Sequence, residues 1–179
     1  MTLDSLTAVD EPYKRQLTSY RRTRSAILEG TKSLIATVGF QRTNMIDIAD
    51  TAEVSRATLY NHFRDKPSVL RALLESEIER VFLAIDSGIS PTEALSEISR
   101  QVSSDPALER MRSTDPAVLV QMLSHVEDPL WLQIKEGLSR LMNNESQSEL
   151  ARLWLVGQVL QPLTTEQGRE QASGISGHW

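Results

Sequence analysis

The chain has 179 residues, and 40% of them are hydrophobic, so it can bury a core and is not disordered as a whole. It contains no cysteine, which excludes disulfides and cysteine-ligated metals, and it has no apolar run near the roughly 18 residues of a membrane span. The net charge of −5 is unevenly spread: residues 12–66 hold ten Lys and Arg against five Asp and Glu, while residues 67–179 hold nine against sixteen. A basic segment before an acidic one favours a head that faces nucleic acid and a body that stays off the phosphates.

The first twenty residues form a polar leader rather than a secretory signal. They contain Asp4, Asp10, Glu11 and Pro12 and lack an apolar stretch. We therefore expect residues 1–20 to be flexible and the protein to be cytoplasmic. A run of basic residues begins inside the leader and continues beyond it, and it could cross a DNA backbone. It consists of Lys14, Arg15, Arg21, Arg22 and Arg24. A solvated charged face is the alternative interpretation of this run.

Prolines mark the helix boundaries along the chain. Four of the seven follow a residue that can cap a helix N-terminus, in the pairs Ser90-Pro91, Asp105-Pro106, Asp115-Pro116 and Asp128-Pro129. Pro67 falls in the first turn after Asp65, and Pro162 should end a long apolar run. No segment alternates polar and apolar residues for long, so the pattern predicts an all-α fold.

In chain order, the first helix is expected from about residue 21 to 38, with Gly39 as its stop. Asn44 caps a short second helix, and Ser55 caps a third helix over residues 56–63. Asp65 caps a long fourth helix, roughly 30 Å in length, which can link two domains. The second and third helices, joined by a tight turn, form a candidate helix-turn-helix.

The remainder of the chain predicts a helical body. We expect helices near residues 91–103, 106–112, 116–126, 129–143 and 147–161. The last of these is apolar almost all round, which predicts burial on two sides. The domain prediction is a leader (1–20), a DNA-binding domain (21–66), a regulatory and dimerisation domain (67–163) and a loose polar tail (164–179).

The residues around the candidate turn carry a specific pattern. Residues 43–66 read TNMIDIADTAEVSRATLYNHFRDK, and Gly39-Phe40 precede them. This stretch closely resembles the DNA-binding signature of the TetR family of repressors, and the resemblance extends over about residues 21–85. The family usually has Gly where this chain has Glu53. A non-glycine residue at positive φ costs on the order of 1 kcal/mol, so the turn either avoids positive φ or accepts that strain.

The resemblance implies an all-α protein with an N-terminal three-helix helix-turn-helix DNA-binding domain and a C-terminal helical ligand-binding and dimerisation domain. It implies a homodimer that pairs helices 129–143 and 147–161, binds a near-palindromic double-stranded operator, and acts as a repressor released by a small molecule. The alternative is a ligand-independent dimeric DNA-binding protein whose body only dimerises or binds a protein partner. An enzyme is the third hypothesis, and the sequence offers it no acid/base or metal constellation.

Eight residues form the predicted DNA-binding set: Thr43, Arg56, Ala57, Thr58, Tyr60, Asn61, His62 and Lys66. Arg56 opens the third helix, where its guanidinium can bind guanine O6 and N7, and Asn61 can bind adenine. The small residues at 57 and 58 allow close approach and can contact a thymine methyl. Tyr60 and His62 are similar to family residues that bind phosphates.

Thr43 and Lys66 lie at helix N-termini, where a hydroxyl, an ammonium and free backbone N–H groups favour phosphate. Three other members of the set have alternative interpretations. Arg56 could instead be a solvated surface residue, and Tyr60 a packing residue. His62 could be a core histidine or a cation that complements the helix dipole.

The C-terminal half offers no catalytic or metal-binding set, and no cofactor is expected. Its histidines are too scattered to form a ligand cluster, and it has no glycine-rich phosphate loop. Six residues could line a ligand pocket between helices: Phe82, Met111, Met122, His125, Trp131 and Trp154. Ordinary core packing is the alternative for each of them.

Overall fold

The computed structural model describes residues 10–85, 89–124, 128–142 and 144–177, and within these ranges every regular element is an α-helix. This confirms the predicted fold class. The helices are α1 (Asp10–Val38), α2 (Met45–Thr51), α3 (Arg56–His62), α4 (Lys66–Ile85), α5 (Pro91–Ser104), α6 (Pro106–Thr114), α7 (Pro116–Ser124), α8 (Pro129–Leu141), α9 (Glu145–Leu160) and α10 (Thr165–Ser176).

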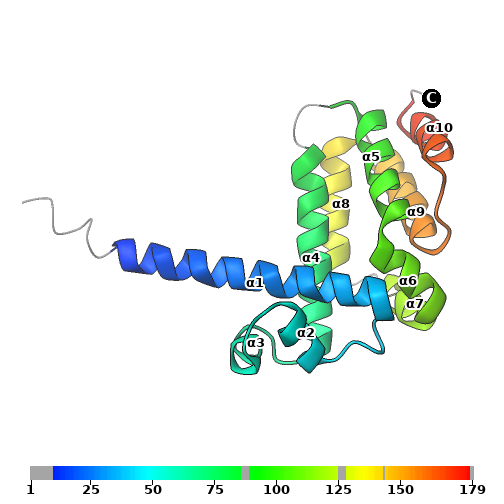
Figure 1. The fold of residues 1–179 in the computed structure, drawn as a ribbon. Coiled ribbons are helices and arrows are strands. Elements are labelled where there is room, and N and C mark those ends of the chain that lie inside the picture. The colour runs from blue at the N-terminus through cyan, green and yellow to red at the C-terminus, as the bar shows by residue number, and fades with distance from the viewer. Residues whose placement is uncertain (1–9, 86–88, 125–127, 143, 178–179) are drawn as a thin grey trace, which may run out of the picture.

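The helices share two hydrophobic cores, and α4 takes part in both (Figure 1). The first core joins α1–α4 to α6 and α7, with Ile27, Leu59 and Leu119 almost fully buried. The second joins α5, α8, α9 and α10 around Leu95 and Leu138. The head helices α1–α3 therefore share their core with part of the body instead of enclosing one of their own.

The predicted capping pattern decides most helix starts. Ser90 forms a capping box with Glu93, and the side chains of Asp105 and Asp128 accept N–H groups of α6 and α8. Asp115 was expected to cap α7 in the same way, and this prediction is wrong. Its carboxylate accepts the backbone N–H groups of residues 40 and 41, far away in the chain.

The first helix is longer than the sequence predicted, because it begins at Asp10 and not near Arg21. Pro12 lies in its first turn, where the missing N–H would have no partner inside the helix. Residues 10–20 are therefore helical and not a flexible leader, while residues 1–9 lie outside the described part of the chain.

The expected loose tail is a packed helix. Thr164 and Gln167 form a capping box that starts α10. Ala172 and Ile175 are buried in the second core, and a Cβ added to Gly168 would lie 2.3 Å from the Ser99 hydroxyl of α5. The short, mostly polar sequence hides this packing, because small residues make the contact and no wide apolar stripe marks it.

The turn between α2 and α3 places a non-glycine residue at positive φ. Glu53 has a φ of +54°, the left-handed conformation that favours glycine. Its N–H donates to the Asp50 carbonyl (3.2 Å), and the N–H of Val54 donates to the Ala49 carbonyl (3.0 Å). These two bonds form the Schellman motif that ends α2.

Glu53→Gly is therefore expected to stabilise the protein. Glycine adopts positive φ without a Cβ clash, so the free energy of unfolding should rise by about 0.5–1 kcal/mol after the greater entropy of an unfolded glycine is allowed for. Urea unfolding followed by circular dichroism measures the change. Glu109→Gly inside α6 is the matched control and should destabilise by about 1 kcal/mol. Loss of stability in Glu53→Gly would mean that the turn does not store this strain.

Candidate nucleic-acid interface

Two short capped helices hold the candidate site. The Asn44 side chain accepts the N–H groups of Ile46 and Asp47, which starts α2, and the Ser55 hydroxyl accepts the N–H of Thr58, which starts α3. Leu59 is fully buried, so α3 is fixed to the first core by its inner side. Capping and burial together place its outer side in a defined orientation.

The outer side of α3 carries four of the predicted DNA-binding residues. Arg56, Ala57, Tyr60 and Asn61 are exposed, at the spacing that places residues on one helix face. Thr58 is half-buried at the edge of this face, and its hydroxyl lies 2.7 Å from that of Ser55. This face offers a guanidinium, a phenol and a carboxamide, which can form hydrogen bonds with base edges and phosphates.

Two predicted phosphate ligands have internal partners. Thr43 is buried, and its hydroxyl donates to the carbonyl oxygen of Gly39 at 2.8 Å. The Lys66 ammonium donates to the carbonyl oxygens of Phe40 (3.0 Å), Gln41 (3.3 Å) and Thr43 (2.9 Å). Both side chains hold the α1–α2 loop in shape, so they do not belong to the exposed face.

His62 packs against α1. Its ring stacks on Tyr20 with centroids 4.2 Å apart, and Nδ1 is buried with no hydrogen-bond partner in the described structure. Burial lowers the pKa of His62, and the nearby charge of Arg24 lowers it further, so the ring is neutral at pH 7. The geometry matches the alternative of a packed histidine better than that of a phosphate ligand.

A family comparison agrees with this geometry. The family model described as "Bacterial regulatory proteins, tetR family" matches residues 27–73, the segment that contains α2 and α3. Residues 27–73 therefore form a DNA-binding domain of the TetR family. This confirms the resemblance seen in the sequence, and the family consists of transcriptional regulators, not of enzymes.

Curated relatives match this chain over part of its length. The "HTH-type transcriptional regulator TtgR" of Pseudomonas putida is 38% identical over 56 residues, which cover 31% of this chain and 27% of that protein. The "HTH-type transcriptional repressor KstR" of Rhodococcus jostii is 35% identical over 95 residues, 48% of this chain and 43% of that protein. The matched regions thus span less than half the length of these relatives.

The fold comparison extends over the body. The "TetR Family Repressor AlkX" from a Dietzia species superimposes with a TM-score of 0.65 at 23% identity, covering 84% of this chain and 92% of that one. At that identity the match establishes the fold alone. No helix in the described residues is long and apolar enough to cross a membrane.

The TetR-family head is anchored to the body through a buried carboxylate that the sequence did not reveal. Asp115, at the junction of α6 and α7, accepts the N–H groups of Phe40 (2.9 Å) and Gln41 (3.0 Å) in the α1–α2 loop. Burial alone would raise the pKa of Asp115, but the Thr114 hydroxyl and the two amides hold it below its ordinary value. A Cβ on Gly39 would lie 2.6 Å from this carboxylate, so the close approach needs glycine.

A second charged cluster also joins the head to the body. The Lys32 ammonium of α1 lies 2.8 Å from the Glu77 carboxylate of α4 and 2.7 Å from the Asp105 carboxylate that caps α6. Burial acts to lower the pKa of Lys32, but its bonds to Asp105 and Glu77 raise it overall. The ammonium therefore stays charged and bridges three helices.

The predicted ligand-pocket set consists of Phe82, Met111, Met122, His125, Trp131 and Trp154. The structure does not gather these residues around one cavity. The two methionines pack in the first core, whereas Phe82 and Trp154 pack in the second, and the Trp154 indole donates to Gln171 of α10 at 2.7 Å. Trp131 lies 5.5 Å from the guanidinium of Arg152, and His125 falls outside the described residues.

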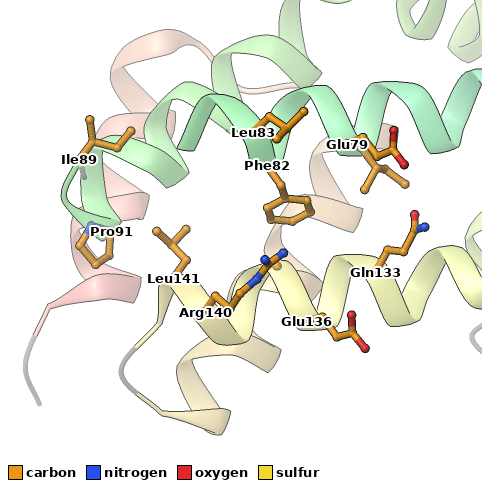
Figure 2. Close-up of a pocket in the computed structure, with 11 residues that line it drawn as sticks. Glu79, Phe82, Leu83, Ile89, Pro91, Gln133, Glu136, Arg140 and Leu141 are labelled. Carbon is orange, nitrogen blue, oxygen red and sulfur yellow. The ribbon is translucent and has the colours of Figure 1, made fainter. Parts of the chain in front are cut away.

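A groove of about 580 Å³ lies between α4 and α8, and Phe82 is the one predicted pocket residue that lines it. Figure 2 shows Phe82 pointing from α4 toward α8, with Arg140 and Leu141 on the facing side. The Phe82 ring packs closely against α8 at Gly137, because a Cβ added to that glycine would clash with the ring. The lining is mixed, because Leu83 and Leu141 stand beside the charged side chains of Glu79, Glu136 and Arg140.

Proposed function

We propose that this protein is a sequence-specific DNA-binding transcriptional regulator of the cytoplasm. The observation that carries the proposal is the outer face of α3, where Arg56, Ala57, Tyr60 and Asn61 lie exposed together on a capped helix fixed by Leu59. A helix held in this way can enter a major groove and present its side chains to base edges. The name of KstR describes a repressor, which favours repression for this chain as well.

A homodimer would give the operator its two-fold symmetry. On α9, Leu150, Leu153 and Leu160 are exposed in a single chain, and Gly157, which has open space around it, lies on the same stripe. The neighbouring α8 exposes Leu132. Apolar side chains at this spacing on two adjacent helices support a four-helix interface with a second copy, which would bury α9 on two sides.

Response to a small molecule is the finer part of the proposal, and two features support it. The α4–α8 groove lies at the end of α4 that enters the second core, while the other end of α4 enters the first core beneath α3. An effector that separates α4 from α8 would shift α4. Lys66 at the start of α4 would carry the shift to the α1–α2 loop, and the Glu77–Lys32 pair would carry it to α1. Full release requires several kcal/mol tighter binding to the DNA-incompetent form.

Fluorescence anisotropy with the full chain tests the function. Labelled DNA from upstream of the protein's own gene, or a duplex selected from a random library, should bind in the presence of excess competitor DNA with two chains per site. Failure of every such duplex to resist competitor would overturn the proposal. The assay also separates the two kinds of regulator: a compound that binds the groove and releases the duplex supports a sensor, whereas a ligand-independent regulator would keep its DNA affinity.

Arg56→Ala is expected to reduce specificity more than general affinity. A bidentate contact to guanine contributes about 1–3 kcal/mol of discrimination, so binding to the selected duplex should weaken about 5- to 150-fold, with little change for competitor DNA. Anisotropy titrations with both duplexes measure the difference. Arg64→Ala, which removes an exposed arginine outside α3, is the matched control. Equal losses on both duplexes would assign Arg56 to a phosphate instead of a base.

A further inference from the structure

The N-terminal half of α1 projects from the molecule with an uncovered stripe. Figure 1 shows this half extending past α3, away from the bundle that contains α5 and α10. Tyr13, Leu17 and Tyr20 follow one another at spacings of four and three residues, so they share one helix face, and they are 61%, 38% and 49% exposed. The same face continues inward to Ile27, which is fully buried in the first core.

The stripe is tied to the recognition helix. The Tyr20 ring stacks on His62, the last residue of α3, and the Arg24 guanidinium lies 5.6 Å from the centroid of the Phe63 ring. These contacts fix the projecting half of α1 relative to α3. Any surface that α3 contacts therefore also comes close to the stripe.

The charge around the stripe indicates what covers it. Residues 10–28 hold five Lys and Arg against two acidic residues, Asp10 and Glu11, which gives +3 in a chain whose net charge is −5. At about 100° per residue, Arg21 borders the stripe, whereas Arg22 lies on the opposite side of α1. Guanidinium and phenol groups together suit the phosphate backbone of a nucleic acid, to which both can donate hydrogen bonds.

We propose that the N-terminal half of α1 is a second DNA-contacting element, which lies against the duplex backbone beside the groove that α3 enters. This inference rests on the proposed function. From Asp10 to Tyr20 the helix reaches about 15 Å, which corresponds to about four base pairs of B-form DNA. The element adds affinity without reading sequence, because its partners are phosphates.

Two double variants on the same helix test the proposal. Lys14→Ala/Arg21→Ala removes charges that border the stripe, and Arg15→Ala/Arg22→Ala removes the same number from the far side. The first should weaken binding to selected and competitor duplexes alike, by about tenfold, and reduce the slope of log K against log salt by about four, because each of the two bound chains loses two cations. The second should change the slope by less than half as much. Circular dichroism should show unchanged helix content in both, since all four side chains are exposed.

Hydroxyl-radical footprinting of the wild type should show backbone protection about four base pairs beyond the α3 contacts, and this protection should be lost in the first variant. Equal effects of the two double variants, or no effect of either, would overturn the proposal. A Leu17→Asp variant that changes the oligomeric state but not the salt slope would assign the stripe to a second copy. If wild-type protein binds no duplex in the presence of competitor, the proposed function fails first, and this inference fails with it.

Discussion

Leu153→Asp is expected to convert the proposed dimer into a monomer and to weaken operator binding at least 100-fold. Leu153 is 53% exposed in the single chain, so the aspartate is hydrated in the folded monomer and its fold should survive. In the proposed dimer the same carboxylate would be buried without a partner, at a cost of several kcal/mol. A monomer binds one half-site at a time, so it loses the effective concentration that a linked second head provides. This effect raises the operator affinity of a dimer by a factor of about 10²–10⁴.

Sedimentation velocity and anisotropy measure the two effects on the same sample. Val120→Asp is the matched control, because it places the same charge on an exposed apolar residue of α7 outside the α8–α9 surface. The control should remain a dimer and retain its affinity for DNA. A dimeric Leu153→Asp protein would place the interface on another surface, whereas a monomer with full operator affinity would exclude paired heads as the source of that affinity.

Asp115→Asn should lower the free energy of unfolding by about 2–3 kcal/mol. The carboxylate accepts two backbone N–H groups in a buried site, and charge-assisted bonds of this kind contribute about 1.5–3 kcal/mol each. An asparagine of the same size keeps one acceptor but turns an N–H₂ group toward the other amide. For a chain of this length the thermal midpoint should fall by about 5–10 °C. Glu109→Gln, on the exposed side of α6, is the control for the lost charge and should change little.

The effect of Asp115→Asn should depend on pH in a defined direction. The pKa of Asp115 is lowered in the folded protein, so its ionised form stabilises the fold fully above the unfolded value of about 3.9. This contribution declines as the pH falls through the folded pKa, because the carboxylate is then protonated in both states. Thermal melts at pH 7 and at progressively lower pH should show the gap between wild type and variant closing. A gap that stays constant would mean that the carboxylate charge is not what anchors the loop.

Local signals in the sequence determined several helix starts and the DNA-binding signature. Ser55, Ser90 and Asp128 cap their helices as predicted, because a cap bonds an N–H two or three residues away and is visible in the chain itself. The same short range explains why the pattern of residues 43–66 identified the family. It also explains why the exposed face of α3 could be anticipated from its period, since the buried Leu59 fixes which side is outward.

Tertiary structure alone decided which polar residues outside the exposed face of α3 hold the fold together. Asp115 has the sequence context of a helix cap, yet its partners lie 74 and 75 residues earlier, and no local pattern encodes that contact. Lys66 and Thr43 match the family signature, but their side chains bond carbonyl oxygens of the α1–α2 loop. His62 faces α1 for the same reason, because α1 begins at Asp10 and supplies Tyr20 to stack on it. Hydrogen bonding and ring stacking depend on distances in space, and only the packing of α1, α4 and α6 brings these groups together.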